Sequence, residues 1–417
     1  MWKSYEQRLQ ATAFSSTILT LPRDQNSLAE ISFFNTTATQ DQFPESSEAM
    51  QNAPPPVVDF SPWTSGASLD QRLQIGRKLV ETCHQKGFAY ISNHGVAPSL
   101  VEEAFAWSKK FFDLPIEDKM QVKRGEDSVA FRGYNVLGVQ KVPLALQVRG
   151  GDPSIKGFSP DFNETFDLGS DENIEQPNKW LPEHVLPGFR EFSTKFYGEC
   201  WKATQNILRA LAIGLGIEDE NLIERLHSYP LNSLSFKHYP PVLLSELDRN
   251  EKKRLGAHSD MTSVTLLFQD NCGGLEFEIP GRRGEFVPIK PIPGTLVMNV
   301  GDALMRWSNG KPTLFHHSPQ VRIISVLKLQ PDYLQSAIHR VQSPPRDPTN
   351  GPGQITRRRY SIPYFVLPKP DKTLECLPCC SNETNPPKYP PTTYKELATG
   401  YGKLFYPEAD VYSTSKD

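Results

Sequence analysis

His258-Ser259-Asp260 is followed closely by the apolar run Val264-Thr265-Leu266-Leu267-Phe268-Gln269. The run is typical of a β-strand, and two ligands at positions i and i+2 on a strand edge or turn project to the same side. An imidazole and a carboxylate can therefore share one metal ion here. A His-x-Asp pair also arises often by chance on a protein surface, so its interpretation depends on the surrounding sequence.

Short apolar runs divided by Gly, Pro and Asn continue on both sides of this pair, from residue 232 to residue 366. They are Leu234–Tyr239, Leu275–Ile279, Phe286–Ile289, Thr295–Val300, Ala337–Val341 and Tyr360–Val366. Several short strands at this spacing predict an all-β sandwich or barrel.

The first half of the chain has a different, mainly helical pattern. Apolar positions at helical spacing predict a helix over residues 69–86 that ends at Gly87, followed by a strand over residues 88–91. A second helix is expected from an N-cap at Ser99 to Phe112, and a long one over residues 189–215. We therefore predict an α+β, mostly β fold in which helices buttress a β core.

Composition excludes several classes of protein. The 417 residues include 45 basic and 48 acidic side chains, and the formal net charge of −3 argues against nucleic acid as a partner. No window approaches 18 consecutive apolar residues, so no membrane span is expected. The polar residues 1–54 end at a proline run and predict a disordered or loosely docked extension.

Six scattered cysteines and the lack of an apolar signal-peptide core fit a reducing, cytoplasmic environment. Lys3, Arg8 and Arg23 among few acidic residues leave a mitochondrial presequence as an alternative. Cys376-Leu377-Pro378-Cys379 is a single CxxC motif. Without a second pair or nearby histidines, it is typical of plain reduced thiols more than of a zinc site.

Further motifs follow the His-x-Asp pair in order. They are Asn299-Val300-Gly301-Asp302, Ser336-Ala337-Ile338-His339-Arg340-Val341 and Arg359-Tyr360-Ser361-Ile362-Pro363. Together with an N-terminal block from Val57 to Val96, they resemble the iron(II)/2-oxoglutarate-dependent dioxygenases. This family includes isopenicillin N synthase and the plant flavonoid and gibberellin oxidases. The resemblance covers about residues 55–400 and is closest in style to fungal members.

The resemblance implies a double-stranded β-helix, or jelly-roll, core and a facial triad of metal ligands. His258, Asp260 and His339 would hold Fe(2+), leaving three coordination positions for 2-oxoglutarate and dioxygen. Beyond these metal ligands and the cosubstrate ligands, the resemblance implies no further catalytic residue.

The resemblance also implies how the cosubstrate is bound. Arg359 would grip the distal carboxylate of 2-oxoglutarate in bidentate fashion, and Ser361 and Tyr239 would add hydrogen bonds. Lys237 stands where plant members usually have Asn, which leaves the cosubstrate contacts at that position open.

The implied function is that of an oxidoreductase that couples oxidative decarboxylation of 2-oxoglutarate to oxidation of a small organic substrate. Hydroxylation, desaturation and ring closure are all open, and fungal secondary metabolism and a monomeric state are expected. One alternative is a 2-oxoglutarate-independent oxidase of the isopenicillin N synthase type. Another is an inactive family member.

A departure from the family pattern makes the inactive alternative relevant. Between Asp260 and His339 lie 78 residues, more than is usual, and the excess falls at Gly310 to Pro331, which is 22 residues. We hypothesise that this stretch is a retained intron or a gene-model error. It contains His316 and His317, which lack the strand context of His339.

We expect four regions along the chain. They are the extension 1–54, a helical and strand region 55–230 that packs on the core, the jelly-roll core 231–370 with the probable insert 310–331, and a C-terminal tail and helix 371–417.

Overall fold

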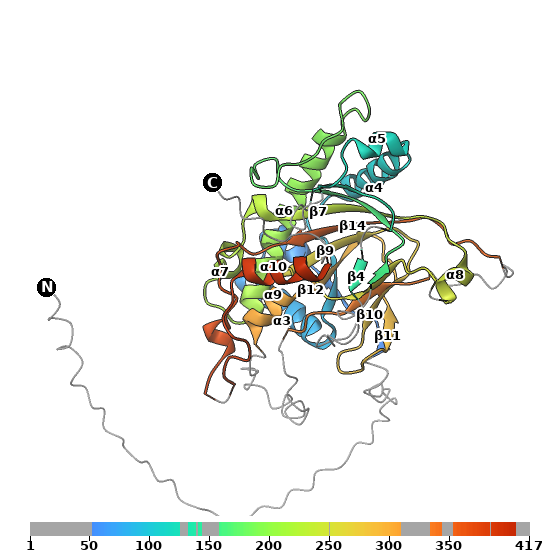
Figure 1. Ribbon diagram of the computed structural model, residues 1–417. Helices are drawn as coiled ribbons and strands as arrows, with labels where there is room; N and C mark the ends of the chain where they lie inside the picture. Colours follow the sequence, from blue (N-terminus) through green and yellow to red (C-terminus); the bar gives the residue numbers. More distant parts are fainter. Residues whose placement is uncertain are drawn as a thin grey trace, which may run out of the picture. The chain divides into compact units, whose positions relative to one another are not determined.

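Two β-sheets form the centre of the computed structural model (Figure 1). It describes residues 52–125, 132–138, 141–143, 158–249, 251–309, 334–343, 353–383 and 385–405. All of these belong to one unit, residues 47–417. Residues 1–51 and the predicted insert 310–331, with His316 and His317, lie outside the described residues.

The larger sheet has eight strands. Its order is β1 (Val57–Asp59), β2 (Phe88–Ser92), β12 (Thr295–Val300), β9 (Val264–Gln269), β14 (Arg359–Val366), β7 (Ser233–Tyr239), β6 (Glu164–Leu168) and β3 (Gly133–Asn135). Only β1 and β2 pair in parallel; the other neighbours in this sheet are antiparallel.

The smaller sheet has the order β11 (Phe286–Pro288), β10 (Leu275–Glu278), β13 (His339–Val341) and β8 (Leu255–His258). A separate pair consists of β4 (Lys141–Pro143) and β5 (Phe158–Pro160). Two mainly antiparallel sheets of this size fit the predicted mostly β, jelly-roll core.

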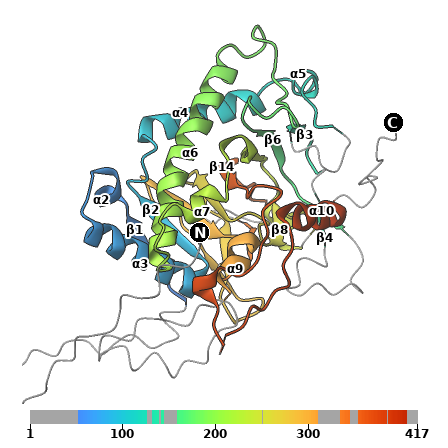
Figure 2. The same cartoon turned by 90° about the vertical axis from the view of Figure 1, so that its left-hand side faces the viewer.

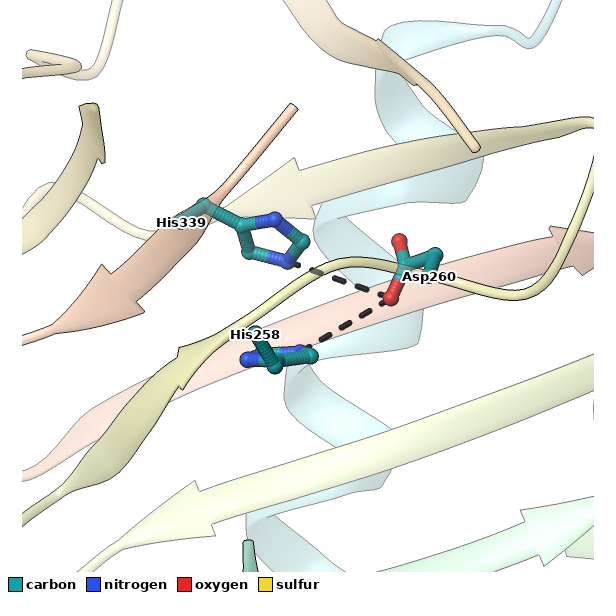
Figure 3. Close-up of side chains that lie close together, drawn as sticks. All are labelled: His258, Asp260 and His339. Carbon is teal, nitrogen blue, oxygen red and sulfur yellow. Dashed lines mark ion pairs between the residues drawn. The ribbon is translucent and has the colours of Figure 1, made fainter. Parts of the chain in front are cut away.

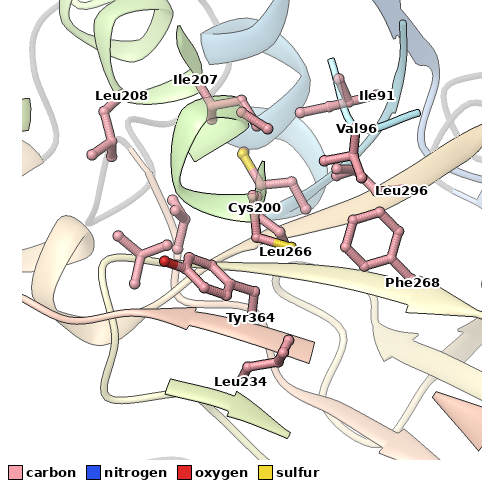
Figure 4. Packing of buried hydrophobic residues seen from close by; sticks show 14 of the residues in the cluster. Ile91, Val96, Cys200, Ile207, Leu208, Leu234, Leu266, Phe268, Leu296 and Tyr364 are labelled. Atoms are coloured by element: carbon pink, nitrogen blue, oxygen red, sulfur yellow. The ribbon is translucent and has the colours of Figure 1, made fainter. Parts of the chain in front are cut away.

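Side chains along each strand of the larger sheet point alternately to its two faces. On the outer face, Leu266, Phe268 and Tyr364 join helical side chains such as Cys200 and Ile207 in the main apolar core (Figure 4). Residues of opposite parity lie on the inner face, where Tyr239 and Val297 join Phe277 of the smaller sheet in a second cluster. A one-residue change of register would exchange these faces, so the apolar pattern fixes the register.

Most of the helices lie in the part of the chain that precedes the first strand of the smaller sheet, β8. They are α2 (Ser61–Thr64), α3 (Leu69–Lys86), α4 (Pro98–Phe112), α5 (Ile116–Met120), α6 (Phe189–Gly214), α7 (Leu222–Arg225), the 3₁₀ turn η1 (Tyr229–Leu231) and α8 (Leu244–Asp248). Three more elements follow: α9 (Asp302–Ser308), η3 (Pro378–Cys380) and α10 (Tyr394–Phe405). Within the described residues, no helix is long and apolar enough to cross a membrane.

Helix α3 has clear start and stop signals. Ser68 and Gln71 form a reciprocal capping box at its N-terminus. Gly87 ends the helix with φ 70°, as the sequence predicts. A Cβ atom at Gly87 would also lie 2.8 Å from Cβ of Ala337. The end of α3 therefore lies directly against the segment that leads into β13.

Helices α3 and α6 lie side by side (Figure 2) because glycine occurs on both helices where they cross. A Cβ atom at Gly214 would overlap the carbonyl oxygen of Gly76, and one at Gly76 would lie 2.6 Å from the carbonyl oxygen of Ala210. The two backbones therefore touch without side chains between them.

Gly214→Ala is expected to destabilise the protein by about 1 to 3 kcal/mol, because the added methyl group forces the two helices apart. The control is Gly198→Ala in the same helix, where the nearest atom to the new methyl group is 3.8 Å away. That change should be neutral or stabilise by up to about 1 kcal/mol. Chemical denaturation measures both; equal effects would refute the crossing argument.

The predicted start of one helix is wrong. Helix α4 begins at Pro98, with Ala97 as its N-cap, and Ser99 lies inside the first turn. Proline at the first helical position fixes φ and lacks an N–H that would be unsatisfied anyway, so it starts the helix without a side-chain cap. Strands β3, β4, β5, β6 and β8 and the short helices α2, α5, α7, α8 and α9 were not predicted.

Candidate metal centre

Two facing strands of the smaller sheet bring His258 and His339 together. His258 is the last residue of β8, His339 is the first of β13, and the two are register partners. Their ring centroids are 4.3 Å apart. Asp260 lies in the turn after β8 and points its carboxylate toward both imidazoles (Figure 3).

The three side chains converge on one point. Nε2 of His258 is 3.7 Å and Nε2 of His339 is 3.9 Å from Oδ1 of Asp260. One ligand atom from each residue lies within 4.8 Å of the other two. In the described part of the chain, no other group of three His, Cys, Asp or Glu side chains meets this condition, and the tail cysteines do not.

Hydrogen bonds orient both imidazoles for metal binding. Nδ1 of His258 lies 2.8 Å from the carbonyl oxygen of Gly256, and Nδ1 of His339 lies 2.9 Å from that of Ala337. A carbonyl oxygen can only accept, so Nδ1 carries the proton in each ring and donates it. The lone pair then lies on Nε2, the nitrogen that faces Asp260. This is the arrangement that metal-binding histidines use.

The carboxylate of Asp260 is fixed in a similar way. Its Oδ2 accepts hydrogen bonds from Oγ1 of Thr265 at 2.7 Å and from Nδ2 of Asn299 at 2.8 Å. Both donors lie on the inner face of the larger sheet. Because Oδ2 is engaged, Oδ1 remains available on the side of the two imidazoles. The site thus offers two nitrogen donors and one oxygen donor.

The protonation states of Asp260 and His258 also favour metal binding. Burial raises the pKa of Asp260, but His339, His258 and the two hydrogen bonds outweigh it, so the pKa lies below its usual value. Burial, then the proximity of His339, lowers the pKa of His258 to about 4. At neutral pH, Asp260 is ionised and His258 is neutral, which are the forms that bind metal.

A buried arginine lies on the inner face of the larger sheet, where Arg359 of β14 pairs with Tyr239 of β7. The guanidinium donates from Nε to the carbonyl oxygen of Gly273 at 3.0 Å and from Nη1 to Oγ of Ser361 at 3.1 Å. Its central carbon lies 4.7 Å from the Tyr239 ring centroid. Among the described residues, Nη2 has no hydrogen-bond partner although it is buried.

The structure thus brings the six residues singled out from the sequence into two groups: His258, Asp260 and His339, and Arg359, Ser361 and Tyr239. The donors Thr265 and Asn299 were not recognised as site residues. Strand parity could have revealed them, because Thr265 and Asn299 are register partners on β9 and β12 and therefore share one face.

Two family models match the chain. Residues 55–183 match the model described as "non-haem dioxygenase in morphine synthesis N-terminal". Residues 230–368 match that of the 2OG-Fe(II) oxygenase superfamily. The second range contains all six residues above.

Similar curated proteins come from fungi. The chain is 32% identical over 335 residues to the 2-oxoglutarate-dependent dioxygenase frbA of Dothideomycetidae sp. (strain 11243), covering 80% of this chain and 91% of the relative. It is 33% identical over 304 residues to the proline hydroxylase buaE of Petromyces alliaceus, covering 73% and 84%.

A solved structure is also similar. It is the crystal structure of a full-length Neurospora crassa protein in complex with alpha-KG and thymine, which is 31% identical to this chain, with a TM-score of 0.67. The match covers 83% of this chain and 97% of that one.

Proposed function

This chain belongs to the 2OG-Fe(II) oxygenase superfamily, and from that premise we propose that His258, Asp260 and His339 are its iron(II) ligands. The enzyme is an iron(II)/2-oxoglutarate-dependent dioxygenase that uses Fe(2+), 2-oxoglutarate and dioxygen. The observation that carries the proposal is the convergence of one ligand atom from each of these three residues within 4.8 Å of one another. Two imidazoles and one carboxylate are the donor set of non-haem iron(II) oxygenases.

Arg359, Ser361 and Tyr239 would bind 2-oxoglutarate. A planar guanidinium can hold a carboxylate with two parallel hydrogen bonds. Nη2 of Arg359 is a buried donor without an acceptor in the described residues, as expected if a ligand supplies that acceptor. The contacts to Gly273 and Ser361 hold the guanidinium in place before the ligand arrives. When bound, iron(II) supplies dioxygen activation coupled to cosubstrate decarboxylation.

The substrate is a small organic molecule. We propose that it is a polar metabolite of a fungal biosynthetic pathway, because one relative is named for proline hydroxylation and one similar structure contains thymine. We also propose that α3, α4 and α6 buttress the core. The contacts that support this join α3 to β2, α4 to β14 and α6 to β14.

The proposal is tested by metal titration without dioxygen. One tight iron(II) site per chain is expected, followed by binding of one 2-oxoglutarate. On admission of dioxygen, succinate should form and depend on both iron(II) and 2-oxoglutarate. Turnover of a substrate without 2-oxoglutarate would identify the isopenicillin N synthase type of reaction, and absence of iron binding would identify an inactive family member.

Thr265→Val is expected to weaken iron(II) binding by about 10- to 100-fold, the usual effect of losing a residue that orients a metal ligand. Valine matches the shape of threonine but cannot donate to Oδ2 of Asp260. Anaerobic iron(II) titration measures the change. Thr295→Val is the control, because the hydroxyl of Thr295 bonds the carbonyl oxygen of Ile292 instead. An unchanged affinity in Thr265→Val would contradict the role given to this bond.

Removal of residues 310–331 is expected to leave a folded, iron-binding enzyme. The chain ends that flank the segment already meet, because the backbone N–H of Leu334 donates to Oγ of Ser308 at 3.3 Å. Joining Asn309 to Asp332 leaves two residues before Leu334, which is enough to span this contact. The shorter connection should stabilise the protein by roughly 1 to 2 kcal/mol.

Thermal unfolding and iron titration of both forms test this expectation. Loss of the fold on deletion would show that the segment is part of the working enzyme. A transcript that retains all 66 bases as its main form would separately contradict the origin of the segment as a retained intron.

A further inference from the structure

Five neighbouring strands of the larger sheet carry a continuous row of polar side chains on the inner face. The row consists of Gln269 (β9), Ser361 (β14), Lys237 (β7), Thr165 (β6) and Asn135 (β3), each a register partner of the next. We call it the polar row. It has the same strand parity as Arg359, Tyr239 and Thr265, so it lies on the face beside Asp260.

Lys237 is the one charged member of the polar row. Its side chain is half-buried and lies within electrostatic range of two groups, His258 and Asp161. Among the described residues, it forms no ion pair and donates no side-chain hydrogen bond. A partly buried ammonium without an anion loses hydration and gains nothing in return, so the position favours a ligand that brings a negative charge.

The nearby carboxyl groups offer Lys237 no full anion, because Asp167 has other partners and Asp161, whose buried Oδ2 has no hydrogen-bond partner among the described residues, is only partly ionised. Oδ2 of Asp167 accepts from Nδ2 of Asn135 at 2.6 Å and from Oγ1 of Thr165 at 2.9 Å, and buried Arg132 interacts with it electrostatically. Oδ1 of Asp161 accepts from the backbone N–H of Gly256 at 2.9 Å. Burial raises the pKa of Asp161 to about 7, so this carboxyl carries only part of a charge near neutral pH.

The charges of the proposed cosubstrate complex balance without Lys237. Iron(II) carries two positive charges and Arg359 one, whereas 2-oxoglutarate carries two negative charges and Asp260 one. The ammonium of Lys237 is therefore in excess. The polar row also continues away from Ser361 onto β6 and β3, which carry none of the residues assigned to the cosubstrate.

From this arrangement we infer that Lys237 binds a carboxylate of the primary substrate and selects for an organic acid, amino acids included. The inference rests on the proposed function and deepens it. Thr165 and Asn135, the next two members of the polar row, already donate to Asp167, so the carboxylate contact is assigned to Lys237 alone.

The test compares acids with their amides as ligands of the full-length protein, loaded with iron(II) and 2-oxoglutarate without dioxygen. The probe pairs are L-proline and L-prolinamide, uracil-5-carboxylate and its carboxamide, and benzoate and benzamide, with binding measured by calorimetry. At least one acid should bind about 10- to 100-fold more tightly than its amide, as expected for a charge-assisted hydrogen bond.

Variants of Lys237 test whether this residue causes the preference for acids over amides. Lys237→Met should remove it, Lys237→Arg should retain it, and Lys237→Glu should disfavour every acid. Lys253→Met is the matched control, because Lys253 also interacts with Asp161 but lies outside the polar row. It should keep the preference for the acid.

Two results would overturn the inference. One is a wild-type protein that binds no acid more tightly than its amide. The other is a Lys237→Met variant that keeps the preference for acids; if it also loses affinity for 2-oxoglutarate, the ammonium is assigned to the cosubstrate. Failure of the wild-type protein to bind iron(II) or 2-oxoglutarate is distinguishable from both, because it contradicts the proposed function itself.

Discussion

His339→Ala and His258→Ala should each abolish tight iron(II) binding and 2-oxoglutarate-dependent succinate formation. Losing a residue that only orients a ligand usually costs about 10- to 100-fold in metal affinity, so losing the ligand itself should cost more. Each change removes one of the three donors that converge at the centre. Anaerobic iron(II) titration gives the affinity directly.

The matched control is His184→Ala, because the imidazole of His184 is exposed. It should bind iron(II) like the wild-type protein. Circular dichroism should show that all three variants remain folded, since His258 and His339 lie at strand ends and not in the main apolar core. A folded His339→Ala protein with unchanged iron affinity would exclude His339 as a ligand.

Arg359→Lys should weaken 2-oxoglutarate binding by about 10- to 100-fold while leaving iron(II) binding intact. Lysine keeps the charge but cannot reproduce the fork of donors that holds a carboxylate. It also cannot make both contacts to Gly273 and Ser361 that orient the guanidinium. Calorimetric titration of the iron-loaded protein with 2-oxoglutarate measures the effect.

The neighbouring Arg358 provides the control for this change. Its side chain is half-exposed and forms an ion pair with Asp113 at 2.5 Å, away from the inner face. Arg358→Lys should leave 2-oxoglutarate affinity within about twofold, as expected for a change at an exposed ion pair. Equal losses in the two variants would mean that 2-oxoglutarate affinity does not depend specifically on the guanidinium of Arg359.

The sequence was sufficient to predict the strands of the core that are apolar and continuous. Val264–Gln269 and Thr295–Val300 alternate between two apolar clusters, and both runs are strands in the structure. Strand β6, Glu164–Leu168, has only Phe166 and Leu168 as apolar signals, and it is held by pairing with β7, about 70 residues later in the chain. A pairing between strands so far apart in the chain leaves no signal in the local sequence.

The candidate site also has residues with a local sequence signal and residues that only the fold reveals. His258, Asp260, His339 and Arg359 were singled out because ordered motifs surround them in the sequence. The donors Thr265 and Asn299 have no such mark, because their importance depends on which face of a strand turns toward Asp260. Lys237 and His258 likewise come within electrostatic range of each other only because folding brings β7 and β8 close to one another.

The contact between Gly87 and Ala337 joins the two matched segments of the chain at the metal centre. The carbonyl oxygen of Ala337 orients His339, and the ring of Phe88, the next residue after Gly87, lies edge-on to that imidazole at 5.8 Å. The N-terminal segment is therefore a structural part of the proposed iron site. Any side chain at residue 87 would push on Ala337 and displace the carbonyl oxygen that orients His339.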